Sequence, residues 1–227
     1  APMPIKTSVS AIAKKAATGD PLPLSGAEED ESTKRQEEEI VSPLRLSELP
    51  SRPAFLEEKQ LTGAERGTLM HRALSLTNLG QMRGDPSLLP EKVRRELHRM
   101  CEEGIFTGEE LLALSAGKMA AFFASSLGQR LLNSPAIRRE WTFTLPLSGE
   151  ETYLQGVIDC AFMENDGWVV LDYKTDRIED EAAFVERYAM QISWYGKAVE
   201  IITGKKVKQR WLYALTTGKA YEVESRL

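Results

Sequence analysis

Residues 156–174, GVIDCAFMENDGWVVLDYK, hold two apolar runs that each include charged side chains, which is unusual for the interior of a strand. The turn signal Asn165–Gly167 separates the runs, so the segment predicts two neighbouring strands. Asp159 lies within the first run, and Asp172 and Lys174 close the second. Because side chains two residues apart on a strand share a face, Asp172 and Lys174 point the same way. If the strands pair across the turn, Asp159 lies near Asp172.

Buried carboxylates are costly unless a cation compensates for them. A divalent ion supplies that charge, and two carboxylates with water and phosphate oxygens form the all-oxygen environment that suits Mg²⁺ or Mn²⁺. Such an ion polarises a phosphodiester and lowers the pKa of a bound water, while Lys174 orients that water or stabilises negative charge. From these three residues alone, a structural alternative stays open. Asp172 and Lys174 would then form an ion pair at a strand edge, and Asp159 would be a hydrogen-bonded core carboxylate.

The flanking sequence predicts an α/β fold. Two capping boxes, Thr62–Glu65 and Thr107–Glu110, and apolar residues at helical spacing predict several helices over residues 62–134, the first of them ending at Gly80. After residue 138 the pattern changes to strands and one long amphipathic helix at 181–203. The strands are expected at 140–145, 153–163, 168–174, 207–215 and 219–223. The expected architecture is a central mixed sheet flanked by helices, with an N-terminal helical part.

The N-terminal quarter of the chain has too few large apolar residues to form a core. Seven of the 11 prolines and no aromatic side chain occur before Phe55. A first short helix is expected within residues 1–15, started by Ser8 as its cap. Residues 16–54 are rich in Pro, Glu, Ser and Lys and predict a flexible linker or long loop. Residues 55–227 are therefore expected to form the folded domain.

Composition excludes several classes of protein. The chain has 227 residues and a net charge of −5, so bulk charge does not favour polyanions, and a nucleic-acid partner requires a local basic face or a metal ion. Its two cysteines cannot form a disulfide framework, a four-thiolate zinc site or an iron–sulfur cluster. There is no apolar run long enough for a membrane span and no signal-peptide pattern, so a cytoplasmic location is expected.

Five motifs, taken in their order, resemble RecB-type nucleases, which have the restriction-endonuclease-like PD-(D/E)XK core. The motifs are Gly67-Thr68-Leu69-Met70-His71, Glu140, Gly156-Val157-Ile158-Asp159, Leu171-Asp172-Tyr173-Lys174-Thr175 and Gln191-Ile192-Ser193-Trp194-Tyr195. The segments Ala64–Thr68 and Ser8–Ser10 are similar to the C-terminal nuclease domains of AddA-type helicase–nuclease subunits. The resemblance covers nearly the whole chain and is weakest over residues 16–50.

The resemblance implies a metal site and a catalytic lysine. His71, Asp159 and Asp172 are implied as metal ligands, together with the backbone carbonyl of Tyr173, and Mg²⁺ or Mn²⁺ is the implied cofactor. Lys174 is implied as the catalytic lysine. A related partner subunit carries four cysteines for an iron–sulfur cluster, and the two cysteines of this chain cannot hold one.

Further residues of these motifs are implied to support the site. Glu140 is implied as the acidic residue that bonds a metal-bound water or another active-site group. Gln191 and Tyr195 are implied to contact DNA or to support the site. Arg187 lies one turn before Gln191 on the same helical row and would add a cation to it. By residue type alone, His71 is a surface or capped core histidine, Tyr195 a packing residue and Glu140 an exposed charge.

The resemblance also implies a biological setting. It implies a metal-dependent deoxyribonuclease, acting as exonuclease or endonuclease on single strands, within a bacterial complex that processes double-strand break ends for recombinational repair. The chain lacks a Gly-x-x-x-x-Gly-Lys-Ser/Thr phosphate loop, so helicase domains are expected upstream in the same parent chain. An AddB-type protein is the implied partner. Two alternatives remain open here: a non-catalytic DNA-binding or subunit-contact module with a nuclease fold, and a free-standing exonuclease.

Overall fold

The computed structural model describes residues 5–9, 61–146, 152–165 and 167–227. The expected linker at 16–54 lies outside the described residues, as does most of the first short helix expected within 1–15. Among the described helices, none has both the length and the apolar character that a membrane span requires.

A mixed sheet forms the centre of the described structure, as the sequence predicted, and it has six strands where five were expected. β1 runs parallel to β3, and β4 runs parallel to β5, while the other neighbouring pairs are antiparallel. The strands are β1 (Ile5–Ser8), β2 (Ile137–Pro146), β3 (Thr152–Glu164), β4 (Gly167–Lys174), β5 (Val207–Ala214) and β6 (Lys219–Glu222). β1 was not predicted from the sequence, because four residues carry little pattern of their own and this strand forms by pairing with β3.

β3 is the longest strand and has different neighbours along one edge. β1 pairs with residues 152–155 of β3, and β4 pairs with residues 160–164. Between them, residues 156–159 pair with neither of these two strands. Along the other edge, β2 pairs with β3 over residues 153–162. The sheet therefore opens beside Asp159.

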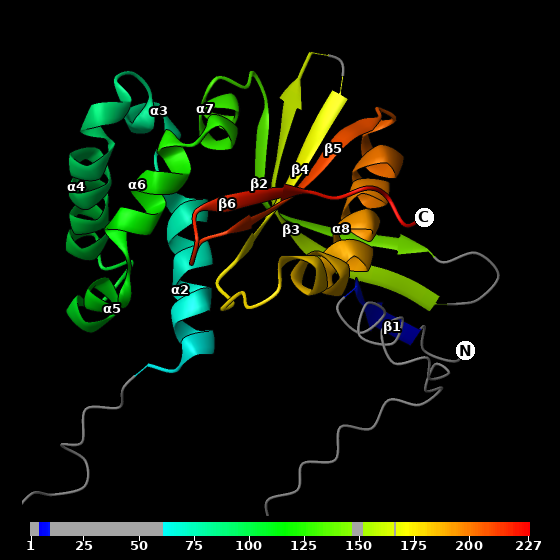
Figure 1. The fold of residues 1–227 in the computed structure, drawn as a ribbon, viewed down its shortest axis with the longest axis horizontal. Coiled ribbons are helices and arrows are strands. Elements are labelled where there is room, and N and C mark those ends of the chain that lie inside the picture. Colours follow the sequence, from blue (N-terminus) through cyan, green and yellow to red (C-terminus); the bar gives the residue numbers. More distant parts are fainter. Residues whose placement is uncertain (1–4, 10–60, 147–151, 166) are drawn as a thin grey trace, which may run out of the picture.

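Helices cover both faces of the sheet, and Figure 1 shows α2 to α6 grouped on the left and α8 on the right. Alternate residues of β4 face opposite sides of the sheet. Val169 and Leu171 pack in one core cluster with the N-terminal helices, and Trp168 and Val170 pack in another with α8. The helices are α2 (Gly63–Leu76), α3 (Leu79–Met82), the 3-10 helix η3 (Pro86–Leu88), α4 (Leu89–Glu102), α5 (Gly108–Ala113), α6 (Ala116–Ala124), α7 (Ser126–Leu132) and α8 (Glu181–Thr203).

Local sequence signals explain most helix ends. Both predicted capping boxes form: the Thr62 side chain accepts from the Glu65 N–H while the Glu65 carboxylate accepts from the Thr62 N–H, and Thr107 and Glu110 do the same. The prediction that Gly80 ends the first helix is wrong. α2 ends at Leu76, where the Thr77 hydroxyl donates to the Ala73 carbonyl oxygen at 2.7 Å, and Gly80 lies inside α3.

Candidate functional site

The candidate site lies where β3 and β4 separate. The Tyr173 N–H is bound there by a side chain: it donates to Asp159 Oδ2 at 2.8 Å. The carboxylate of Asp159 therefore bridges the opening between the two strands. This contact places Asp159 next to the strand segment that carries Asp172 and Lys174, as the two-strand prediction required.

His71 approaches Asp159 from α2. Its Nδ1 lies 3.2 Å from Asp159 Oδ2, and its ring packs edge-on against the Tyr173 ring with 6.0 Å between centroids. Burial by itself lowers the pKa of His71, but the hydrogen bond and negative charge of Asp159 outweigh it and raise that pKa above its ordinary value. His71 therefore contacts Asp159 directly, and the surface alternative does not describe it.

Asp172 and Lys174 form the buried half of the site. Lys174 Nζ lies 2.7 Å from Asp172 Oδ2, and the Asp172 residue is 2% exposed. Burial raises the pKa of Asp172, and the nearby charge of Asp159 adds to this, while the Lys174 ammonium opposes it. Apart from this ammonium, no group of the described chain donates a hydrogen bond to Oδ2. Such an oxygen has capacity left for a further cation.

Side chains from α8 hold the lysine. Lys174 Nζ donates to Gln191 Oε1 at 3.1 Å, and Gln191 Nε2 donates to Tyr195 Oη at 2.9 Å. The ammonium also lies 4.2 Å from the centroid of the Tyr188 ring, where the face of the ring favours a cation. The predicted pair Gln191 and Tyr195 thus reaches the site through Lys174, and Tyr195 is at the same time a buried packing residue.

Tyr188 is a site residue that the sequence motifs missed. Its hydroxyl donates to Asp176 Oδ1 at 3.0 Å, which ties α8 to the loop after β4. The available signal was its spacing, three residues before Gln191 on the same helical face. Arg187, which was predicted for this row, instead faces solvent beside the network, with its side chain 65% exposed and Nη1 4.0 Å from Asp176 Oδ1.

Glu140 interrupts the β2–β3 pairing between Arg139, which pairs with Cys160, and Trp141, which pairs with Ile158, and it has a left-handed backbone, with φ of 46°. At Glu140 the strand changes the face on which alternate side chains lie. Arg139 contacts α2 on one face of the sheet, whereas Trp141 and Phe143 pack with the α8 cluster on the other. A left-handed residue other than glycine costs roughly 1–2 kcal/mol. Partial loss of hydration and the charge of Asp159 raise the pKa of Glu140. The strain and the pKa shift both mark this residue as part of the site.

An open cleft of about 490 Å³ exposes one half of the site. His71, Glu140 and Asp159 line it, whereas Asp172 and Lys174 lie behind them. The described residues that line the cleft are Ala64, Gly67, Thr68, His71, Arg72, Ser75, Glu140, Val157, Asp159 and Thr175.

The cleft depends on a close approach of α2 to the end of β4. A Cβ added at Gly67 would lie 2.7 Å from the Thr175 side-chain oxygen, closer than real Cβ contacts come. Glycine at this position therefore lets α2 lie against Thr175, and His71 is carried one turn further along the same helix. The Gly-Thr-x-x-His motif has a packing reason as well as a chemical one.

We expect Gly67→Ala to lower the free energy of unfolding by about 1–2 kcal/mol, because the β-branched Thr175 cannot move aside freely. The double variant Gly67→Ala/Thr175→Ala should recover most of this loss. Gly63→Ala is the matched control on the same helix, since its added Cβ meets nothing within 4 Å. Urea unfolding followed by circular dichroism measures all three, and an unchanged midpoint for Gly67→Ala would contradict the packing role.

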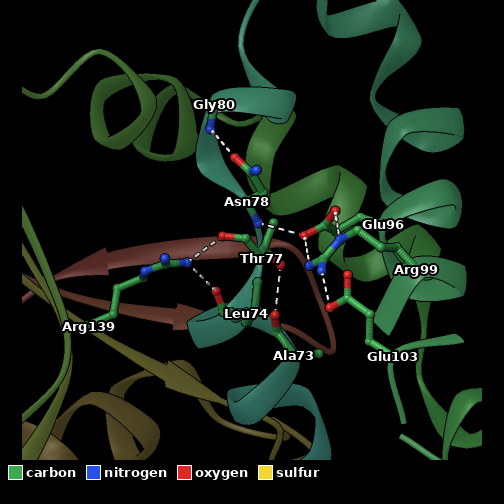
Figure 2. Close-up of polar contacts among 9 residues, drawn as sticks. All are labelled: Ala73, Leu74, Thr77, Asn78, Gly80, Glu96, Arg99, Glu103 and Arg139. Atoms are coloured by element: carbon green, nitrogen blue, oxygen red, sulfur yellow. Dashed lines mark hydrogen bonds and ion pairs between the residues drawn. The ribbon is translucent and has the colours of Figure 1, made fainter. Parts of the chain in front are cut away.

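Arg139 anchors the other end of α2 (Figure 2). Its Nη1 donates to the carbonyl oxygens of Thr77 at 2.7 Å and Leu74 at 3.2 Å, which the helix end leaves without backbone partners. The adjacent Asn78 N–H donates to the buried Glu96 carboxylate, which Arg99 holds at 2.8 Å. Because Arg139 directly precedes Glu140, this network ties α2 and β2 together. No sequence signal distinguished Arg139 from a surface arginine.

The oxygen atoms of this site are the kind of ligand that a hard divalent ion prefers. Asp159 and Asp172 supply carboxylate oxygens, and the buried Oδ2 of Asp172 has the Lys174 ammonium as its one partner among the described residues. Within the part of the chain that the structure describes, no three His, Cys, Asp or Glu side chains converge into a complete metal cage. Mg²⁺ commonly binds through one or two carboxylates and completes its shell with water and substrate oxygens, so two carboxylates suffice.

Comparison with known proteins assigns a family to this fold and site. A family model described as the PD-(D/E)XK nuclease superfamily matches residues 44–225. An ATP-dependent helicase/nuclease subunit from Clostridium novyi (strain NT) is 36% identical over 78% of this chain and 15% of that protein. Proteins with the same name are 38% identical over 75% of this chain in Thermoanaerobacter sp. (strain X514) and 36% identical over 83% in Desulforudis audaxviator (strain MP104C). The match covers 15% of the Thermoanaerobacter protein and 16% of the Desulforudis protein, so the chain spans about one-sixth of the length of these relatives.

Proposed function

Because the chain belongs to the PD-(D/E)XK nuclease superfamily, we propose that it hydrolyses phosphodiester bonds of single-stranded DNA with a divalent metal ion, Mg²⁺ or Mn²⁺. The family match confirms the resemblance that the sequence motifs indicated. The observation that carries the proposal is the placement of Asp159 and Asp172 beside Lys174, where β3 and β4 separate. A packed core without chemistry would gain little from two carboxylates and an ammonium at this depth.

Asp159 and Asp172 would hold the ion. The motif resemblance implies His71 and the Tyr173 carbonyl as further ligands, and in the described structure His71 Nδ1 is turned to Asp159 Oδ2. When bound, the ion would polarise the phosphodiester and lower the pKa of a bound water. His71 already lies against Asp159, so its imidazole orients that carboxylate as well. Glu140, at the rim of the same cleft, would accept a hydrogen bond from the attacking water.

Lys174 supplies a positive charge at a defined point. Burial alone lowers its pKa, but the charge and hydrogen bonding of Asp172 outweigh this and raise it, so the side chain is an ammonium at neutral pH. The contact with Gln191 and the Tyr188 ring fix its position before substrate arrives. A fixed ammonium stabilises the negative charge that develops on the phosphate in the transition state.

The setting of this reaction is proposed from the relatives. They are named as ATP-dependent helicase/nuclease subunits and are several times longer than this chain. We place the chain as the nuclease domain of such a protein, with helicase domains elsewhere in the parent chain and an AddB-type partner. The proposed role is the processing of double-strand break ends for recombinational repair.

Metal dependence tests the proposed reaction. We expect the chain to cleave a 5′-labelled single-stranded oligonucleotide with Mg²⁺ or Mn²⁺, to stop when EDTA is added, and to resume when excess Mg²⁺ is restored. Gel electrophoresis of the products measures the rate. Cleavage that persists in EDTA would contradict the metal-dependent reaction. Binding of the oligonucleotide without cleavage under every metal condition would instead support a non-catalytic module.

A further inference from the structure

Arg72 lies in the cleft but belongs neither to the proposed metal site nor to the contacts that hold Lys174. It follows His71 on α2, is exposed, and is the one lysine or arginine among the described residues that line the cleft. The same cleft holds the carboxylates of Glu140 and Asp159, and the whole chain has a net charge of −5. A phosphodiester backbone entering the cleft therefore meets negative charge unless a local cation offsets it.

The guanidinium of Arg72 is positioned by an aromatic ring. Its Cζ lies 5.1 Å from the centroid of Phe106, which is itself buried. No carboxylate of the described chain forms an ion pair with it, whereas Arg99 pairs with Glu96 and Glu103. Stacking restricts the plane of a guanidinium but leaves its N–H groups able to donate in that plane. The guanidinium of Arg72 is thus partly held in place, and no carboxylate of the described chain neutralises it.

Neighbouring side chains on the same face of α2 have few N–H or O–H groups left to donate to an anion in the cleft. The Thr68 hydroxyl donates to the Ala64 carbonyl oxygen at 3.2 Å, and the Ser75 hydroxyl donates to the Arg72 carbonyl oxygen at 2.9 Å. A hydroxyl has one proton, and phosphate oxygens only accept hydrogen bonds. His71 is directed at Asp159 through Nδ1. Among these side chains of α2, the guanidinium is the group with several donors left.

We propose that Arg72 binds a phosphate of the DNA strand next to the one that is cleaved. This inference rests on the proposed function, and it adds a substrate-binding site to it. His71 points to Asp159 in the proposed metal site, whereas Arg72 points to Phe106 in the segment between α4 and α5, so Arg72 lies away from the phosphate that the metal would hold. An arginine contacts a phosphate through two parallel N–H donors, a geometry that a lysine ammonium cannot provide.

The test measures binding separately from cleavage. Fluorescence anisotropy of a labelled oligothymidylate is recorded between about 50 and 200 mM salt, with the unsubstituted chain as the reference and EDTA present to remove the metal that cleavage requires. We expect the substitution Arg72→Gln to weaken binding about tenfold at low salt and to reduce the slope of log K against log salt by about 0.7, the value of one phosphate contact on a single strand. Arg72→Lys should keep the slope and lose part of the affinity, because the charge remains but the paired donors do not.

Arg94→Gln is the matched control. It removes the same charge from an exposed position on α4, a helix that contributes no described residue to the cleft, and should change neither affinity nor slope. Equal affinity and slope for Arg72→Gln and Arg94→Gln, or no measurable binding by the reference at low salt, would overturn the phosphate site. A chain that binds through Arg72 but does not cleave DNA with Mg²⁺ would contradict the proposed nuclease reaction and leave this site standing.

Discussion

Asp172→Asn should reduce the rate of metal-dependent cleavage by at least about 1,000-fold. The substitution keeps the shape of the side chain and removes one of the two carboxylates proposed to hold the ion. Loss of about 4 kcal/mol of transition-state stabilisation corresponds to this factor, and a metal ion supplies several kcal/mol by stabilising charge. Steady-state cleavage of a labelled single-stranded oligonucleotide at saturating Mg²⁺ measures it.

The folded state of this variant needs its own control. Asp172 is the ion-pair partner of the buried Lys174, and removal of one partner leaves the other charge uncompensated. The double variant Asp172→Asn/Lys174→Gln removes both charges and should unfold at a higher denaturant concentration than Asp172→Asn. Both proteins are expected to be inactive. Cleavage by a folded Asp172→Asn chain at a rate within tenfold of the unsubstituted chain would contradict the assignment of Asp172 to the metal site.

Lys174→Gln should reduce cleavage by about 100- to 1,000-fold, the range found when one pre-organised donor to developing negative charge is lost. The neutral amide cannot replace a fixed ammonium whose position is set by Asp172, Gln191 and Tyr188. The loss should appear in kcat more than in KM, because the charge that Lys174 stabilises grows in the transition state.

Lys219→Gln controls for the removal of one lysine. Lys219 pairs with Glu181 at 2.6 Å on the surface, and its side chain is 60% exposed, so its loss should change neither the rate nor the stability appreciably. The two active-site changes should also be strongly non-additive, since Asp172 and Lys174 act as one unit. A Lys174→Gln chain with the kcat of the Lys219→Gln chain would remove the lysine from the proposed mechanism.

The elements of the fold were largely predictable because their signals are local. Two capping boxes, one long amphipathic helix and an apolar hairpin around residues 165–167 each lie within a few turns or one strand pair. β1 was not predictable in this way, because its pairing partner on β3 is about 147 residues away in the sequence. The end of α2 was placed wrongly at Gly80 for a similar reason: Glu96 of α4 and Arg139 of β2 bind the backbone just after Leu76.

The sequence by itself determined that three charged residues, Asp159, Asp172 and Lys174, would lie on adjacent strands, since the alternation of side chains and a short turn require it. Only the tertiary structure decided which further groups reach them. His71 arrives because Gly67 lets α2 approach β4, and Tyr188 and Arg72 acquire their ring contacts from other elements. The ring contacts of Tyr188 and Arg72 arise from packing between different elements, so no local pattern records them, whereas the Gly-Thr-x-x-His motif did indicate His71.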